Sequence, residues 1–119
     1  MLVDTSVWID HVRRGEPRLI TLLDDNAVDL HPFVIGELAC GHLGARDEIT
    51  QLLRRLPLLP TVDHEEALIF LDRHKLHGRG IGWIDLHLLA STMLADTALW
   101  THDRHMATVA RELHIELYG

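Results

Sequence analysis

The chain has 119 residues, of which 47% are hydrophobic and 24% are charged, and its formal net charge is −7 with neutral histidines. This length fits one folded domain over residues 1–119, and the composition excludes a disordered chain. The negative charge argues against a protein that holds nucleic acid by bulk attraction. All basic residues except Lys75 are arginines, however, and the planar arginine fork suits phosphate.

Three features predict a soluble, cytoplasmic protein that does not enter a membrane. Cys40 is the single cysteine, so no internal disulfide can form, and this is typical of a reducing compartment. We expect Cys40 to be a small core residue. The N-terminus lacks the basic and apolar regions of a signal peptide, and no apolar run reaches the length of a transmembrane helix.

Short apolar runs alternate with longer helical patterns in the first half of the chain, as in a parallel sheet covered by helices. We predict strands at 1–4 and 27–30 and an extended segment at 57–60. The predicted helices of this half are 6–14, 18–25, 32–42 and 47–56.

In the second half, Asp63 and Glu66 form a capping box that begins a helix running to about His77. The segment 78–82 is a flexible glycine loop, followed by the most apolar helix at 83–95. A buried strand at 97–101, a helix from Asp103 to Leu113 and an edge strand at 115–117 complete the chain. The pattern predicts a three-layer α/β/α sandwich with a central parallel sheet.

Two acidic residues lie at or just after the ends of predicted strands. Asp4 ends the first strand, and Asp103 lies two residues after Leu99-Trp100-Thr101. Ligands of open parallel sheets bind outside the carboxyl ends of the strands, at the switch in strand order. We therefore expect Asp4 and Asp103 to meet there. Each also has a simpler explanation, because either could serve only as the N-cap of the helix that follows it.

Two further acids stand in apolar helical segments. Glu37 has Val34 and Leu38 as neighbours on its helix, and Asp85 lies in the first turn of the helix that begins at Trp83. An acid on an apolar face should be paired or bind a metal. Asp85 could instead be a dipole-stabilising residue, and Glu37 could form a core salt bridge with an arginine.

Four clustered carboxylates would repel one another without a cation and would offer the oxygen ligands that Mg²⁺ or Mn²⁺ prefers. A metal held there would activate water and stabilise a phosphoryl transition state. The four acids thus predict a metal site that cleaves phosphodiester bonds. The predicted catalytic and metal-binding residues are Asp4, Glu37, Asp85 and Asp103.

Four motifs in order resemble those of the PIN-domain family, and most of all the VapC-type toxins of bacterial toxin–antitoxin pairs. They are residues 3–9 (VDTSVWI), 35–38 (IGEL), 82–90 (GWIDLHLLA) and 99–103 (LWTHD). The resemblance spans nearly the whole chain and implies a small α/β/α sandwich. It also implies an endoribonuclease that depends on Mg²⁺ or Mn²⁺ and acts on RNA.

The resemblance maps the four acids of the family onto the same four residues. Ser6, or Thr5, matches the hydroxyl that follows the first acid, and Thr101 matches the threonine before the fourth; these would support metal or water indirectly. A further acid of some members is replaced here by Arg104-His105-Met106, which implies one firmly held metal. The resemblance also implies a homodimer and a cognate antitoxin that blocks the site.

Other features have competing interpretations. The glycine loop either ends a helix and acts as a hinge, or is a mobile rim loop whose Arg79 meets RNA phosphate; Arg13 and Arg14 are similar candidates. The ten histidines raise the alternative of a zinc site, but no HExxH motif or clustered Cys/His spacing is present. Short helices around Trp8 and residues 19–23 form either an exposed groove or core.

Two rival functions remain from the sequence. A phosphatase or phosphotransferase would use Asp4 as its nucleophile, but such enzymes usually need an acid two residues later, where Ser6 stands. A non-catalytic RNA- or protein-binding module would have a degenerate site, and the presence of all four acids weighs against it.

Overall fold

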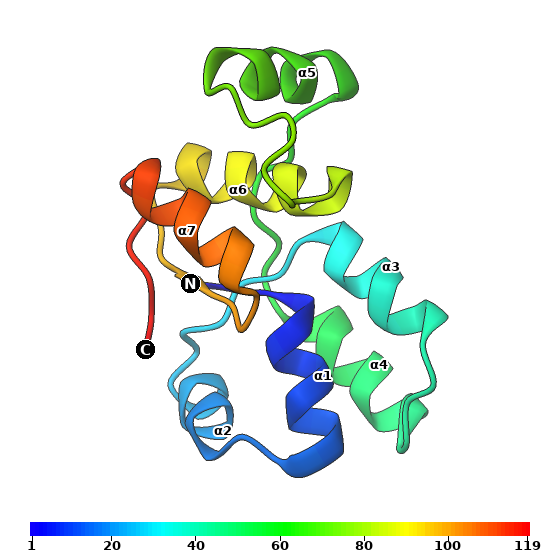
Figure 1. Ribbon diagram of the computed structural model, residues 1–119. Coiled ribbons are helices and arrows are strands. Elements are labelled where there is room, and N and C mark those ends of the chain that lie inside the picture. Colours follow the sequence, from blue (N-terminus) through cyan, green and yellow to red (C-terminus); the bar gives the residue numbers. More distant parts are fainter.

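The computed structural model describes all residues from 1 to 119 and places a short parallel sheet between two groups of helices (Figure 1). Strand β1 (Leu2–Val3) pairs in parallel with β2 (Leu99–Trp100). The backbone amide of Leu2 donates to the carbonyl of Ala98 at 2.9 Å, and that of Asp4 donates to Trp100 at 2.9 Å. Segments nearly one hundred residues apart in sequence thus form the centre of the sheet.

Isolated parallel bridges extend this pair on both sides. They join Leu2 to Asp29, Leu30 to Leu58, and Leu99 to Leu117. The order across the sheet is therefore 58, 30, 2, 99 and 117, and all pairings are parallel. The extended segments predicted at 27–30, 57–60 and 115–117 are present but are reduced to isolated bridges, two for the first segment and one for each of the others.

The strand order reverses between β1 and β2. The chain leaves β1 toward the edge that contains Leu30 and Leu58, and later returns to β2 on the opposite side of β1. The carboxyl ends of β1 and β2 therefore flank the switch point, where open parallel sheets bind ligands.

The helices lie on both sides of this sheet, which confirms the predicted α/β architecture. In Figure 1, α5 and α6 lie at the top and α1, α2 and α4 at the bottom, with the N-terminal strand between them. Packing joins α1 to α3, α3 to α4, and α5 to α6. The helices are α1 (Thr5–Arg14), α2 (Pro17–Asp24), α3 (Pro32–Cys40), α4 (Arg46–Arg55), α5 (His64–Arg73), α6 (Trp83–Ala95) and α7 (Arg104–Glu112). None of these helices combines the length and apolar character needed to cross a membrane.

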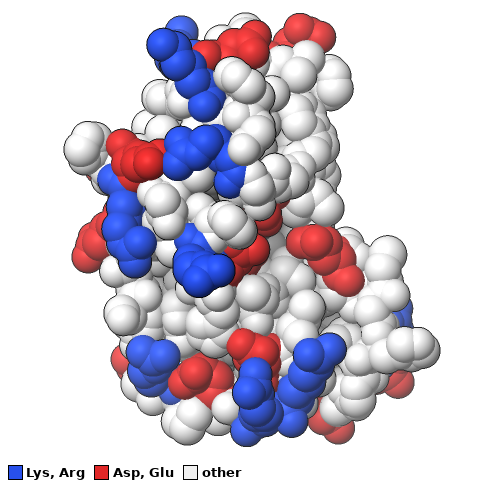
Figure 2. Space-filling model, viewed as in Figure 1, with Lys and Arg blue, Asp and Glu red and all other residues white.

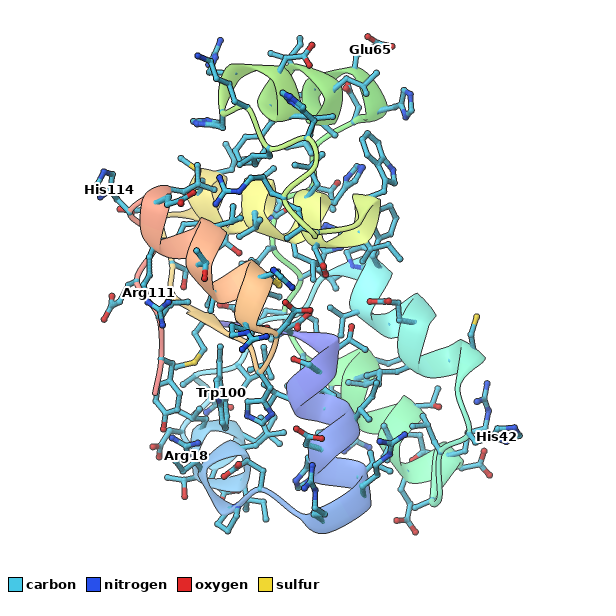
Figure 3. All side chains as sticks on the ribbon, viewed as in Figure 1. Arg18, His42, Glu65, Trp100, Arg111 and His114 are labelled. Carbon is cyan, nitrogen blue, oxygen red and sulfur yellow. The ribbon has the colours of Figure 1, made fainter.

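The core centres on the sheet and on α6. Helix α6 has the predicted bounds, and all its residues from 86 to 92 are buried. Trp8 and Leu19 are also fully buried, so the short helices α1 and α2 face the core at these residues. The guanidinium of Arg18 lies over the ring of Trp100 at 5.0 Å and thereby ties α2 to β2 (Figure 3).

The predicted end of one helix and the predicted burial of Cys40 were wrong. Helix α5 ends at Arg73 rather than near His77, because Lys75 has a φ of 53°, a left-handed conformation that ends helices. Cys40 is exposed, not part of the core. Helix α3 buries Val34 and Leu38, and Cys40 lies beyond the last of these at the outer end of the helix. The predicted capping box at the start of α5 is confirmed.

Candidate active site at the switch point of the sheet

Asp4 lies at the carboxyl end of β1, and its side chain is only 4% exposed. It occupies the N-cap position of α1, yet its side chain makes no capping hydrogen bond. Its Oδ2 instead accepts hydrogen bonds from the hydroxyls of Ser6, at 2.7 Å, and Thr101, at 2.8 Å. Its Oδ1 receives none from the protein. Asp4 is therefore held for a purpose other than helix capping.

The same two hydroxyls join the ends of β1 and β2. Thr101 Oγ1 accepts a hydrogen bond from the backbone of Asp103 at 3.0 Å, and Ser6 Oγ accepts one from His102 at 3.0 Å. Each hydroxyl donates to the Asp4 carboxylate and accepts from the chain just after β2. The position of Asp4 is thereby fixed relative to the start of α7.

Asp103 caps the helix that follows it and leaves one carboxylate oxygen without a protein partner. Its Oδ1 accepts a hydrogen bond from the backbone of Met106 at 2.9 Å and caps α7. Its Oδ2 has no hydrogen-bond donor in the protein, so one oxygen remains available to a ligand. The capping hydrogen bond thus orients the carboxylate and occupies only one of its two oxygens.

Glu37 is exposed, which corrects the expectation that it lies on an apolar face. Its neighbours Val34 and Leu38 turn inward, whereas position 37 lies at the edge where α3 meets α1. It forms no salt bridge with an arginine. Thr5 is nearly buried at the start of α1, and its Oγ1 donates to Glu37 Oε1 at 2.7 Å. Glu37 is a rim residue steered by one hydroxyl.

Asp85 lies in the first turn of α6 and is half-buried. The pKa of its carboxyl is raised from 3.8 to about 6. Burial is the largest cause, and the negative charge of Asp4 is the second. The backbone of Gly82 opposes this shift, while the charges of Asp103 and Glu37 add to it. Asp85 is therefore within electrostatic reach of the other three predicted acids. We call Asp4, Glu37, Asp85 and Asp103 the acid site.

The acid site fits a hard divalent cation by its donor chemistry. Its donors are carboxylate oxygens alone, as Mg²⁺ and Mn²⁺ prefer, and Asp4 and Asp103 each present an oxygen without a protein donor. No group of three or more His, Cys, Asp or Glu side chains is arranged as a ready-made metal centre. The acids would thus have to move toward a cation to bind it together.

The predicted RNA-contacting arginines lie in different surroundings. Arg13 is exposed, makes no ion pair, and lines a cavity of about 130 Å³ between α1 and α3 together with Glu37. Arg14 pairs with Asp10 at 3.0 Å. Arg79 pairs with Glu112 of α7 at 2.8 Å. On the face that Figure 2 shows, basic and acidic side chains are interspersed, and no broad basic surface is present.

Sequence reasoning missed one residue beside the acid site. Asp10 accepts from the ring of His102, which directly precedes Asp103, and this hydrogen bond, with that from Arg14, lowers the pKa of the Asp10 carboxyl. The signal was available, because Asp10 follows Ser6 by four residues and so lies on the same face of α1. The pair ties α1 to the segment after β2.

Comparison with known proteins points the same way as the geometry. The model of the PIN domain matches residues 1–112. Proteins named Ribonuclease VapC32, from two strains of Mycobacterium tuberculosis (CDC 1551 / Oshkosh and H37Rv), are 43% identical over 118 residues, which is 98% of this chain and 95% of theirs. A solved structure of FitAB bound to an IR36 DNA fragment has a similar fold, with a TM-score of 0.62 and 21% identity over 98% of this chain and 92% of that one.

Proposed function

This chain belongs to the PIN-domain family, and from that premise we propose that it is a metal-dependent endoribonuclease that hydrolyses RNA at the acid site. The relatives named as ribonucleases support this reaction class. The observation that supports the proposal most is that Asp4 and Asp103 follow the two central strands, β1 and β2. The charges of Asp4, Asp103 and Glu37 also raise the pKa of Asp85. We also propose that the chain is the toxin of a toxin–antitoxin pair, as its resemblance to VapC-type proteins implies.

The cofactor we propose is Mg²⁺ or Mn²⁺, held by Asp4, Asp85 and Asp103 with Glu37 at the rim. When bound, the cation supplies positive charge that offsets the four carboxylates and stabilises the negative charge developing on a phosphodiester. Hydrolysis adds water across one P–O bond, so one RNA end leaves as a hydroxyl and the other as a phosphate monoester.

The contribution of the chain itself is to keep the carboxylates oriented. Ser6 and Thr101 occupy one oxygen of Asp4 and leave the other without a protein donor. Thr5 likewise donates to one oxygen of Glu37. Such preorganisation lowers the cost of arranging charge during the reaction.

The test uses purified protein, a labelled RNA and two site variants. Cleavage should require Mg²⁺ or Mn²⁺, stop in EDTA, and be lost in Asp4→Asn and Asp85→Asn without a loss of folding. Asp63→Asn is the matched control, because Asp63 is an exposed N-cap of α5 and asparagine caps equally well. Equal cleavage in EDTA, or full activity of both site variants, contradicts the proposal.

The natural substrate requires a second experiment. Sequencing RNA ends after brief expression should reveal cuts that recur at defined sites and are absent with Asp4→Asn. A covalent phosphate trapped on Asp4 would instead support the phosphatase that the sequence left open. A folded protein without cleavage or phosphate transfer would support a binding module.

We propose that the cognate antitoxin covers the cavity between α1 and α3, because this cavity opens beside Glu37. Its apolar lining includes Ile9, Val12 and Leu43, and Arg13 stands at its edge. A segment with apolar and acidic side chains would fit there. Co-expression of the antitoxin should abolish RNA cleavage, and Val12→Arg should weaken this inhibition without lowering cleavage by the free toxin. Unchanged inhibition of Val12→Arg would place the antitoxin elsewhere.

We propose that a homodimer forms through α5 and α6. Ile69 is 56% exposed and Leu94 61% exposed, and both line an open apolar groove between these helices. Glu66 and Arg73 flank the groove on α5, so a two-fold copy would bring opposite charges together. Leu94→Arg should convert a dimer to a monomer in light-scattering measurements, whereas Leu58→Arg, at an exposed leucine elsewhere, should not.

A further inference from the structure

The glycine loop, residues 78–82, packs against α7. Gly80 has a φ of 79°, and a Cβ added to it would lie 3.2 Å from both Cγ and Nδ1 of the His105 ring. The imidazole of His105 therefore rests directly on the backbone of Gly80. A Cβ at this position would press on the ring and require it to shift. The loop that the sequence predicts as a hinge or a rim segment thus contacts α7 in the structure.

A second contact holds the same loop farther along α7. Arg79 Nη2 lies 2.8 Å from Glu112 Oε2 and 2.9 Å from its Oε1. His105 and Glu112 are seven residues apart, so they lie on one face of α7, two turns from each other. The Arg79 and Glu112 side chains are 35% and 51% exposed, and ion pairs of this kind contribute little to stability.

The loop connects two parts of the acid site. His105 follows Asp103 by two residues in the first turn of α7, and Gly80 precedes Asp85 by five residues. Gly82, the last residue of the loop, interacts through its backbone with the Asp85 carboxyl. A shift of Gly80 away from α7 would move the start of α6 relative to the start of α7.

We propose that Gly80 and His105 are positioning residues, whose contact sets the distance between Asp85 and Asp103. The inference rests on the proposed function, in which both acids hold the cation. His105 acts through its ring shape and not as a ligand. Residues that support metal ligands in this way typically contribute about 10–100-fold to metal affinity or activity.

Gly78 provides a matched control for the test. Its φ is 70°, close to that of Gly80, but a Cβ on Gly78 would meet nothing within 4 Å. Alanine at either position therefore suffers the same backbone strain, and only Gly80→Ala presses on His105. Mn²⁺ affinity, from the loss of the free-ion paramagnetic resonance signal, should fall about tenfold or more in Gly80→Ala and no more than about twofold in Gly78→Ala. The two variants should lose similar thermal stability without metal.

Variants of His105 keep the proposal testable if Gly80→Ala does not fold. His105→Ala should lower Mn²⁺ affinity, and His105→Phe should retain it, because a ring is still present. With RNA, kcat should fall in His105→Ala while KM changes little. Equal Mn²⁺ affinity in Gly80→Ala and Gly78→Ala overturns the proposal, as does equal loss in His105→Phe and His105→Ala. A wild-type protein that binds no Mn²⁺ overturns both this inference and the proposed function.

Discussion

The two sides of the acid site are built differently. On the sheet side, Asp4 is buried at a strand end and held by the hydroxyls of Ser6 and Thr101. On the helix side, Glu37 is exposed at the rim and is held by Thr5 alone. Asp4 is therefore fixed relative to the sheet, whereas Glu37 can move toward a ligand.

The sharpest test of this contrast compares the two acids themselves. Asp4→Asn should lower metal-dependent RNA cleavage by about 10²–10³-fold, the size typical of losing one preorganised electrostatic group. Glu37→Gln should lower it less, by about tenfold, because Glu37 is exposed and water can replace its charge at the rim. Single-turnover cleavage rates at saturating Mn²⁺ measure both. Equal losses would show that the two sides contribute alike.

The hydroxyls that hold each acid give a smaller and independent comparison. Thr101→Val removes both a donor to Asp4 and an acceptor for the Asp103 amide, so Mn²⁺ affinity should fall about tenfold. The free energy of unfolding should fall by about 1–3 kcal/mol, the cost of unpaired buried polar groups. Thr5→Val removes one hydrogen bond to an exposed acid and should change Mn²⁺ affinity by only about twofold. Isothermal titration and urea unfolding would report both, and a larger effect of Thr5→Val would reverse the contrast.

The pH dependence of metal-free stability is the smallest expected effect. The folded-state pKa of Asp85 is raised to about 6 from the ordinary 3.8, so the fold favours the protonated carboxyl. The contribution of Asp85 to the free energy of unfolding is therefore most favourable below pH 3.8, and falls as pH rises to about 6. Asp85→Asn should remove this slope and make the metal-free protein more stable at pH 7 than the wild type. Parallel curves of the two proteins between pH 4 and 7 in EDTA would contradict the expected coupling.

The location of the acid site could be predicted from the sequence, because it follows from topology. Asp4 follows β1 directly and Asp103 lies three residues after β2, so the strand pattern alone places both at the carboxyl edge of the parallel sheet. Helix α6 was predicted with its observed bounds because its apolar run is long and its N-terminal glycine is clear.

The surroundings of individual side chains could not be predicted in the same way. The exposure of Glu37 and Cys40 depends on where the outer turns of α3 leave the core, and neighbouring residues in sequence do not determine this. The end of α5 depends on the left-handed conformation of Lys75, a residue type that rarely adopts it. The packing of Gly80 on His105 is a contact between distant segments. The glycine pattern alone could not predict that the loop contacts α7.

The unequal strength of the sheet has a consequence for how the protein opens. β1 and β2 share a paired register at the centre, whereas the segments at Leu58 and Leu117 are each joined by one bridge. Local opening begins where few hydrogen bonds hold a segment, so the amides of Leu59 and Tyr118 should exchange with deuterium well before that of Asp4. The ends of β1 and β2 would then stay together while the edges fray. The residues that approach the cation therefore belong to the part of the sheet that opens last.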